Sequence, residues 1–360
     1  MNILFISALS GLVSAGPSWS IPARIKAQEQ FDNILWINLS EATMPHWEAV
    51  KSFHKISEYK SLSLCDLPYP FNRPDIVVFE NFYSMREVWF SKELNRNNIP
   101  YVVVPRGSLT IASRNNSKWL KKRIAHWLFF DRFLRKSAAI QYLTSREADM
   151  STPNDLNSFI MPNGICLPER RKSKFSANSI LCVFIGRLDI YTKGLDILIR
   201  ALASIRSEIK ANHLILNLYG PINKDYSELQ KSIQENDLDD VVFLKGEISG
   251  KQKEEVLMES DVFILTSRTE GHPMGLIEAL SYGMPSLVSK GTNMAKEIEQ
   301  TNSGWICEGL TSESIAHAFK QMISEVDSLQ IKSNNARCLA QQYDWATIAQ
   351  GFHDEMLRLL

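Results

Sequence analysis

The chain has 360 residues, and its 40 Lys and Arg balance 40 Asp and Glu, so the formal net charge is zero. Hydrophobic residues make up 44% and charged residues 22%, which is typical of a globular protein and excludes wholesale disorder. Neutrality also excludes a general nucleic-acid binder, which needs a large basic excess. The length favours two domains. The first half has a net positive charge and the second a net negative charge, which favours different binding partners for the two halves.

The cysteines form no Cys-x-x-Cys pair and are odd in number, so neither a disulfide framework nor a zinc site is expected. A reducing cytosol is the natural setting for such a chain. The apolar N-terminus lacks a preceding Lys or Arg, and it predicts a buried first strand instead of a signal peptide. No apolar run approaches the ~18–20 residues that span a bilayer.

Short β-branched runs alternate with amphipathic stretches along the chain, which predicts βαβ units and mostly parallel sheets. The expected strands are residues 3–6, 34–38, 76–79, 101–104, 139–142, 158–161, 181–185, 214–219, 241–244, 262–265 and 286–289. The expected helices are 92–97, 118–136, 194–210, 227–236, 249–258 and 276–282, followed by a helical tail over 311–360.

The strand and helix pattern restarts near residue 180, after a charged segment without periodicity. The sequence therefore predicts an α/β protein with two domains, residues 1–168 and 178–340. The last helix, 341–360, is expected to cross back to the first domain.

A basic segment with interleaved aromatic residues spans 114–136, where eight Lys and Arg face a single Asp. Such a segment is typical of a helix that lies on a membrane surface. A cationic outer face whose aromatic residues pack into the core is an equally good interpretation.

Two cations follow the first strand of the second half. That strand ends at Gly186, and Arg187 and Lys193 lie in the loop before the next helix. Loops at the carboxyl ends of parallel strands are where α/β sheets bind ligands, and an Arg fork with a Lys point charge suits a diphosphate. The alternative is two solvated surface cations.

Two carboxylates, Glu270 and Glu278, flank a turn and a helix start after strand 262–265. Pro273 suits the first helical turn, and the amides at this start would face an anion. Glu278 lies in an apolar stretch and needs a partner, although a lone helical Glu is more often solvated. Of the seven histidines only His272 falls in such a motif, and no spacing indicates a metal site. Two more strands end in Gly220-Pro221 and Lys245-Gly246.

In this order, these motifs resemble the donor domain of retaining glycosyltransferases of family 4. The resemblance is firm over residues 180–310 and looser elsewhere. It implies the GT-B fold, in which two Rossmann-like domains face each other across a cleft and the C-terminal helices pack back on the first domain.

By matched position, the resemblance implies that Arg187 and Lys193 bind the diphosphate and that Glu270 contacts the donor sugar. These three are the expected catalytic residues, and Glu278 is expected to hold the ribose hydroxyls. The expected donor-binding set is Gly16, Gly186, Gly220, Lys245, Gly246, Gly271, His272, Pro273, Met274, Gly275, Leu276 and Glu278.

The first half is expected to supply the acceptor side, through Arg106, Gly107, Thr144 and Glu147. The Gly-rich first loop departs from the family pattern, because Pro17 follows Gly16 and removes a backbone donor. Arg106 stands where many relatives have a His, and an Arg cannot act as a general base at neutral pH.

The resemblance implies a retaining, metal-independent hexosyltransferase that binds no cofactor and uses a UDP- or GDP-sugar as co-substrate. The implied acceptor is a saccharide or lipid-linked saccharide in bacterial surface polysaccharide synthesis. The protein would be cytoplasmic, with peripheral contact to the inner membrane face through 114–136, and would bind no nucleic acid. Two alternatives are another GT-B enzyme, such as a sugar-nucleotide epimerase or phosphorylase, and a non-catalytic sugar-nucleotide-binding subunit.

Overall fold

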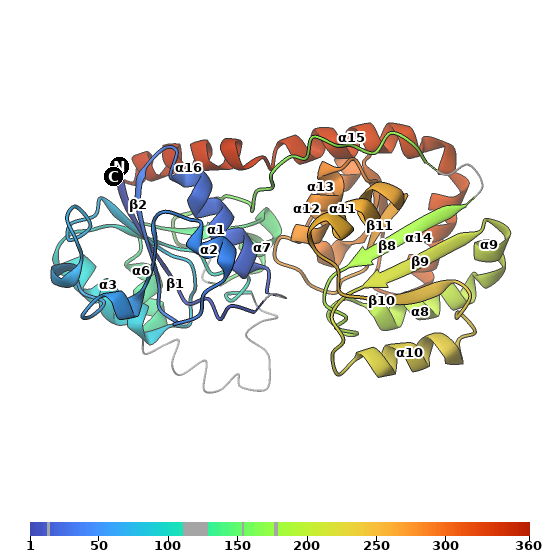
Figure 1. Ribbon diagram of the computed structural model, residues 1–360, viewed down its shortest axis with the longest axis horizontal. Coiled ribbons are helices and arrows are strands. Elements are labelled where there is room, and N and C mark those ends of the chain that lie inside the picture. The colour runs from blue at the N-terminus through green and yellow to red at the C-terminus, as the bar shows by residue number, and fades with distance from the viewer. Residues whose placement is uncertain (13–14, 111–128, 153–154, 176–178) are drawn as a thin grey trace. The chain divides into compact units, whose positions relative to one another are not determined.

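The computed structural model describes residues 1–12, 15–110, 129–152, 155–175 and 179–360 (Figure 1). The chain divides into two compact units. The first comprises residues 1–164 together with 345–360, and the second comprises residues 165–344. Both are α/β units whose strand pairs are parallel, as the sequence predicted.

Among the described residues, the sheet of the first unit has seven strands in the order β3-β2-β1-β4-β5-β6-β7. They are β1 (Asn2–Ser7), β2 (Asn33–Asn38), β3 (Phe53–Lys55), β4 (Ile76–Phe79), β5 (Tyr101–Val103), β6 (Ala139–Tyr142) and β7 (Ser158–Ile160). The helices are α1 (Pro17–Gln28), α2 (Pro45–Glu48), α3 (Met85–Arg96), α6 (Asp131–Arg135), α7 (Ser145–Asp149) and α16 (Trp345–Leu359).

The described sheet of the second unit has six strands in the order β10-β9-β8-β11-β12-β13. They are β8 (Ile180–Ile185), β9 (Leu214–Tyr219), β10 (Val242–Gly246), β11 (Val262–Leu265), β12 (Ser286–Ser289) and β13 (Gly304–Cys307). The helices are α8 (Leu195–Ser204), α9 (Arg206–Ala211), α10 (Tyr226–Glu235), α11 (Gly250–Glu259), α12 (Met274–Ser281), α13 (Ala295–Gln300), α14 (Ser312–Ser324) and α15 (Leu329–Gln341).

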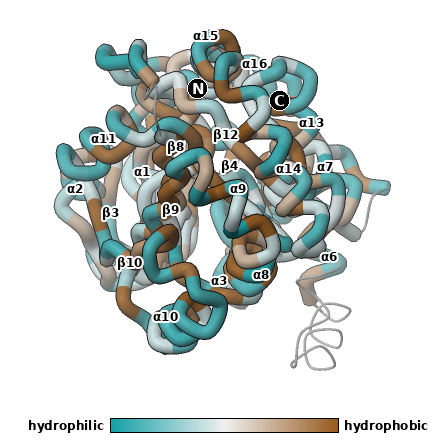
Figure 2. Tube along the Cα trace, turned by 90° about the vertical axis from the view of Figure 1, so that its right-hand side faces the viewer, coloured by the Kyte–Doolittle hydropathy of each residue, from teal (hydrophilic) through white to brown (hydrophobic). Residues whose placement is uncertain are grey.

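The strands are more apolar than the helices that cover them, because both faces of a parallel sheet are buried. Figure 2 shows hydrophobic colour through β8, whereas much of α10 is hydrophilic. In α10 only Leu229 and Ile233 are buried, four residues apart on one helical face.

Helix α1 was not among the predicted helices, and its two prolines explain why. Pro17 occupies the first turn, where a missing N–H costs little. Pro22 lies inside the helix and has no N–H to donate to the carbonyl of Ser18. The indole Nε1 of Trp47 donates to that carbonyl instead, at 2.7 Å, so a side chain distant in sequence compensates for the proline.

The charged segment after residue 168 belongs to the second unit. Lys172 is buried, its Nζ lies 3.3 Å from Asp261 Oδ1, and its backbone N–H donates to the carbonyl of Tyr282 at 2.8 Å. The chain therefore changes units earlier than its composition indicates, between Gly164 and Ile165.

The basic segment 114–136 lies mostly outside the described residues. In its described end, Phe133 and Leu134 are buried, while Arg132 and Arg135 are exposed. The predicted helical tail contains breaks, and α14, α15 and α16 are separate helices.

The last helix returns to the first unit next to the residue at which the chain leaves it. The backbone of Gly164 packs directly on the indole of Trp345, and a Cβ there would lie 2.5 Å from two ring carbons. Further along α16, the ring of Phe352 packs near that of Phe5, with centroids 6.1 Å apart.

Gly164→Ala is expected to lower the free energy of unfolding by about 1–3 kcal/mol, because the methyl group overpacks the contact with Trp345. Equilibrium urea unfolding measures the change. Gly351→Ala is the matched control, since its Cβ would meet only the side chain of Met161, no closer than 3.5 Å, within a helix that alanine favours. Equal stability of the two variants would contradict this packing argument.

Candidate functional site

The second sheet has a switch point between its two central strands. β8 pairs with β11, and the chain proceeds from β8 through α8 to β9 on one side but from β11 through α12 to β12 on the other. The loops after these two strands, residues 186–194 and 266–273, therefore diverge at the carboxyl edge. Ligands of open α/β sheets bind at such a point.

The loop after β8 is held by hydrogen bonds to Asp189 within the loop itself. Asp189 Oδ1 accepts a hydrogen bond from the amide of Thr192 at 2.7 Å, and the Asp189 carbonyl accepts one from the amide of Lys193 at 3.0 Å. Gly194 follows with a φ of +65°, and the Thr266 carbonyl oxygen leaves no room for a Cβ there. A glycine at this position lets the β8 loop approach the end of β11.

Lys193 and Glu270 form an ion pair between the two loops, each side chain being 13% exposed. Ser267 Oγ donates a hydrogen bond to the same carboxylate oxygen at 2.7 Å. The structure therefore brings together two of the predicted catalytic residues, and it adds Ser267, a contact that the sequence did not predict.

Asn293, another missed residue, fixes the backbone beside this pair. It has a φ of +61°, and its Nδ2 donates to the carbonyl of Glu270 and, at 3.1 Å, to that of Gly271. Asn tolerates the left-handed conformation, so this position suits its residue type. The turn that precedes α12 is thereby held by a side chain from beyond β12.

Helix α12 begins at the same edge. Pro273 is its N-cap residue in an extended conformation, and Met274 and Gly275 open the helix. The first amides of a helix have no acceptor within it and carry partial positive charge. A Cβ on Gly275 would lie 3.1 Å from the carbonyl oxygen of Ile185, so this helix start lies close to the end of β8. Leu276 is buried behind it.

Glu278, one turn further along α12, pairs with Lys253 of α11, and both side chains are about a quarter exposed. The apolar sequence around Glu278 indicated that the carboxylate needs a partner. The sequence did not predict Lys253 as that partner, because α11 and α12 meet only in the folded chain.

Arg187 lies in the β8 loop with its side chain exposed, and it makes no ion pair or hydrogen bond with the part of the chain that the structure describes. Lys245 is also exposed, and its Nζ lies 5.1 Å from the ring centre of Phe243. Unlike Arg187 and Lys245, Lys193 forms an ion pair, with Glu270.

Three glycines of the predicted donor-binding set lie at neighbouring strand ends, and their role is in the backbone geometry. They are Gly186, Gly220 and Gly246. A Cβ at Gly220 would clash with the Gly186 carbonyl oxygen and would lie 2.8 Å from Leu188 Cγ. Gly186 donates its N–H to the Tyr219 carbonyl at 3.0 Å, and Gly246 has a φ of +77°. They allow neighbouring strand ends to approach each other closely.

His272 is buried, and its ring centre lies 5.1 Å from that of Tyr343. Burial lowers the pKa of His272 to about 3, so the imidazole is neutral at physiological pH. Its ring therefore contributes shape and polarity to the turn but no positive charge.

In the first unit, Arg106 belongs to a buried ion triad. Its Nη2 lies 2.7 Å from Glu80 Oε2, and Nη1 of the buried Arg24 lies 2.8 Å from Glu80 Oε1. Burial raises the pKa of Glu80, but the two guanidinium groups outweigh burial and lower it. Arg106 Nη1 also donates to Asn163 Oδ1 at 3.2 Å. The triad thus joins the ends of β4 and β5 to α1.

Glu147 binds backbone amides on two loops. Its Oε1 accepts from Gly107 N at 2.5 Å, and its Oε2 accepts from Leu143 N at 2.8 Å. Thr144 is the N-cap of α7, the helix that contains Glu147, and its Oγ1 accepts a hydrogen bond from the Glu147 amide at 3.1 Å. Burial raises the pKa of Glu147. Gly16, in contrast, is open, because a Cβ there would meet nothing within 4 Å.

Within the described ranges, no group of three or more His, Cys, Asp or Glu side chains is arranged to hold a metal ion. No helix of those ranges combines the length and apolar character needed to cross a membrane.

Residues 168–338 match the family model described as glycosyl transferases group 1. The chain is 28% identical over 130 residues to the amylovoran biosynthesis glycosyltransferase AmsK of Erwinia amylovora, covering 34% of this chain and 31% of that protein. It is 28% identical over 166 residues to the putative colanic acid biosynthesis glycosyltransferase WcaL of Escherichia coli K12, covering 44% and 39%. Each match spans less than half of the relative's own length.

The structure of Anabaena HepE in complex with UDP resembles the whole chain, with a TM-score of 0.77, 18% identity and full coverage of both chains. At this identity the likeness concerns the fold alone. It confirms the predicted GT-B architecture of two Rossmann-like α/β units.

His272 makes stability depend on pH. A histidine in the unfolded chain has a pKa of about 6.5, whereas that of folded His272 is about 3. Between these values the unfolded state binds the extra proton, so the free energy of unfolding falls as pH drops, by up to about 1.4 kcal/mol per pH unit.

Urea unfolding at pH 7 and pH 5 measures this loss. His272→Gln is expected to lose less stability than the wild type, while His213→Gln, at an exposed site, loses as much as the wild type. Equal losses in the wild type and His272→Gln would refute the argument.

Proposed function

We propose that this protein is a glycosyltransferase that moves a hexose from a nucleotide-diphosphate sugar to a saccharide acceptor in bacterial surface polysaccharide synthesis. The observation that carries the proposal is the Lys193–Glu270 pair at the switch point of the second sheet, beside the start of α12. The family match over residues 168–338 and the names of the two relatives support the reaction class and the pathway. HepE, whose structure contains UDP, supports the nucleotide.

The donor diphosphate would bind where positive charge gathers at this edge. Arg187 is unpaired among the described residues, Lys193 lies at the loop junction, and the α12 amides add partial charge. An arriving diphosphate would share Lys193 with Glu270. The same groups would stabilise the charge that develops on the leaving nucleoside diphosphate.

The two carboxylates would hold hydroxyl groups at opposite ends of the donor. Glu270 is ordered by Ser267 and Lys193, and it would accept hydrogen bonds from the sugar. Glu278, ordered by Lys253, would accept those of the ribose. Carboxylates accept hydrogen bonds strongly, which suits recognition of a polyhydroxylated ligand.

The proposed reaction retains the configuration of the sugar and uses no resident metal, as the resemblance to glycosyltransferase family 4 implies. The bond between the anomeric carbon and the diphosphate oxygen breaks, and a bond to the acceptor oxygen forms on the same face. The acceptor proton passes to the leaving phosphate. The donor is a UDP- or GDP-hexose, with Gly220, Lys245 and Gly246 near the nucleotide.

The acceptor would be a saccharide or a lipid-linked saccharide presented by the first unit, with Gly107 and Thr144 near it. The composition of 114–136 supports peripheral contact of this protein with the inner face of the cytoplasmic membrane. Arg106 and Glu147 would hold the backbone of that site in place. Their charged atoms already form an ion pair with Glu80 and hydrogen bonds with backbone amides, respectively.

Glu270→Gln and Lys193→Met are each expected to lower kcat by about 100-fold or more, the effect of removing one charged group from an active site. Release of UDP or GDP from a panel of sugar nucleotides, with lipid extract as acceptor, measures this. Lys231→Gln, an exposed lysine on α10, is the control that keeps activity. Wild-type protein that never consumes a donor, or variants that keep full activity, would refute the enzyme proposal.

Glu278→Gln is expected to weaken binding of UDP or GDP, whichever the wild type binds, by about tenfold, through loss of a charge-assisted hydrogen bond to ribose. Binding of inorganic pyrophosphate should be unchanged, because it has no ribose. Titration calorimetry measures both ligands, with Glu255→Gln on α11 as the exposed control. Equal weakening of pyrophosphate binding would contradict the ribose assignment.

A further inference from the structure

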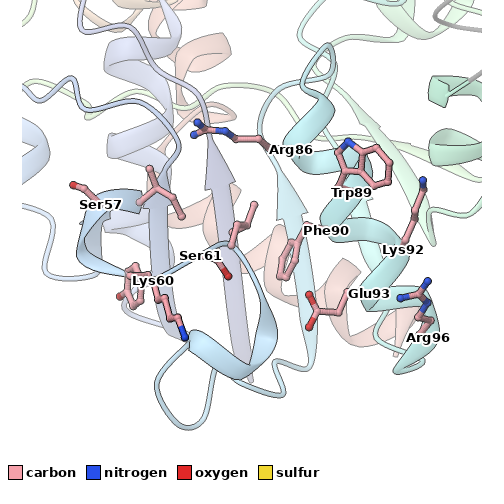
Figure 3. A pocket seen from close by; sticks show the side chains of 12 residues that line it. Ser57, Lys60, Ser61, Arg86, Trp89, Phe90, Lys92, Glu93 and Arg96 are labelled. Carbon is pink, nitrogen blue, oxygen red and sulfur yellow. The ribbon is translucent and has the colours of Figure 1, made fainter.

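A groove of about 950 Å³ lies in the first unit between α3 and the turn η1 (Ile56–Glu58) with the residues that follow it. Its volume is near the upper end of the ~300–1,000 Å³ typical of ligand sites, so the groove is large enough for a ligand of more than one chemical group. Figure 3 shows Arg86 near the ends of the strands, with Lys60 and Arg96 at the other end of the groove. Every lining residue belongs to the described part of the first unit.

The helical repeat of α3 explains this lining. Arg86, Trp89, Glu93 and Arg96 recur at intervals of three and four residues, so they share one face of the helix. Val88 and Leu94 lie on other faces and are buried. One amphipathic helix therefore supplies half of the residues that line the groove.

Basic side chains dominate the charge of the groove. Lys60, Lys92 and Arg96 make no ion pair or hydrogen bond with any described residue, and Arg86 uses one nitrogen, Nη1, to bind the Leu39 carbonyl at 3.0 Å. The carboxylate Glu93 accepts from Ser63 Oγ at 2.9 Å and from Leu64 N at 3.1 Å. The four cations of this groove therefore outnumber its one carboxylate.

Trp89 presents an aromatic surface to the same groove, and it is 60% exposed, compared with 44% for Trp19. The ammonium group of Lys92 lies 3.8 Å from its ring centre, which helps to orient the indole. An indole at a groove wall can pack against the flat C–H face of a pyranose ring.

We infer that this groove binds an anionic saccharide chain, with Trp89 against a sugar ring and Lys60, Lys92 and Arg96 against carboxylate or phosphate groups. The hydroxyls of Ser57 and Ser61 add donors and acceptors for sugar hydroxyls. This inference rests on the proposed function, because it makes the ligand the growing acceptor chain and names its chemistry as anionic.

A membrane surface fits this groove less well. Interfacial binding favours a protruding apolar face with cations around it. Here the cations line a concavity, together with hydroxyls and the engaged Glu93 carboxylate. A saccharide chain can enter such a concavity, whereas a bilayer is broad and flat.

Titration calorimetry of the full chain with an oligogalacturonide tests the inference, with a neutral maltooligosaccharide of equal length for comparison. The charged chain is expected to bind at least tenfold more tightly, and more weakly as salt rises. Trp89→Ala and the double variant Lys60→Gln/Arg96→Gln should each weaken binding by about tenfold. The controls Trp19→Ala and Lys51→Gln/Arg73→Gln, outside the groove, should bind like the wild type.

Unchanged binding in both groove variants, equal binding of the neutral chain, or binding only to phosphatidylglycerol vesicles would overturn the inference. Thermal unfolding verifies that each variant is folded. UDP and GDP binding is measured on the same proteins. If the groove shows no specific saccharide binding while UDP or GDP still binds, only the groove inference fails. If the saccharide binds as expected while neither UDP nor GDP binds, the transferase proposal fails instead.

Discussion

The ion pair between Lys193 and Glu270 joins two loops that leave neighbouring parallel strands and then run to opposite sides of one sheet. Its geometry depends on residues that carry no charge. Gly194 allows the loops to meet, Ser267 orients the carboxylate, and Asn293 fixes the turn behind it. The pair is therefore a product of topology, and it keeps a cation and a carboxylate at the place where an α/β sheet admits a ligand.

Charged side chains of this protein serve either the fold or a ligand site, and burial decides which. In the first unit, Glu80 is fully buried between Arg24 and Arg106, so that network is structural and costly to break. In the second unit, Arg187 is exposed at a loop, and Lys193 remains slightly accessible. The zero net charge of the chain conceals this division between charges committed to the fold and charges open to ligands.

Much of the fold could be predicted because buried parallel strands are nearly continuous apolar runs, as in Ile76–Phe79 and Val262–Leu265. Helix α1 could not, since its Pro22 is compensated by Trp47, a contact that only the folded chain creates. In the site, Glu278 visibly needed a partner, but the sequence does not reveal Lys253 on another helix. For the same reason, sequence patterns could not predict that Arg106 is buried against Glu80.

The proposed transfer requires that a nucleotide-diphosphate sugar binds to the second unit, and thermal unfolding of the full chain with UDP-, GDP- and ADP-hexoses tests this binding most directly. A ligand that binds only the folded state raises the unfolding temperature in proportion to the logarithm of its concentration. We expect one UDP- or GDP-sugar to do so in the wild type, and to lose most of its effect in an Arg187→Gln/Lys193→Met double variant. No shift with any sugar nucleotide at millimolar concentration, or an equal shift in the double variant, would contradict a sugar-nucleotide site at Arg187 and Lys193.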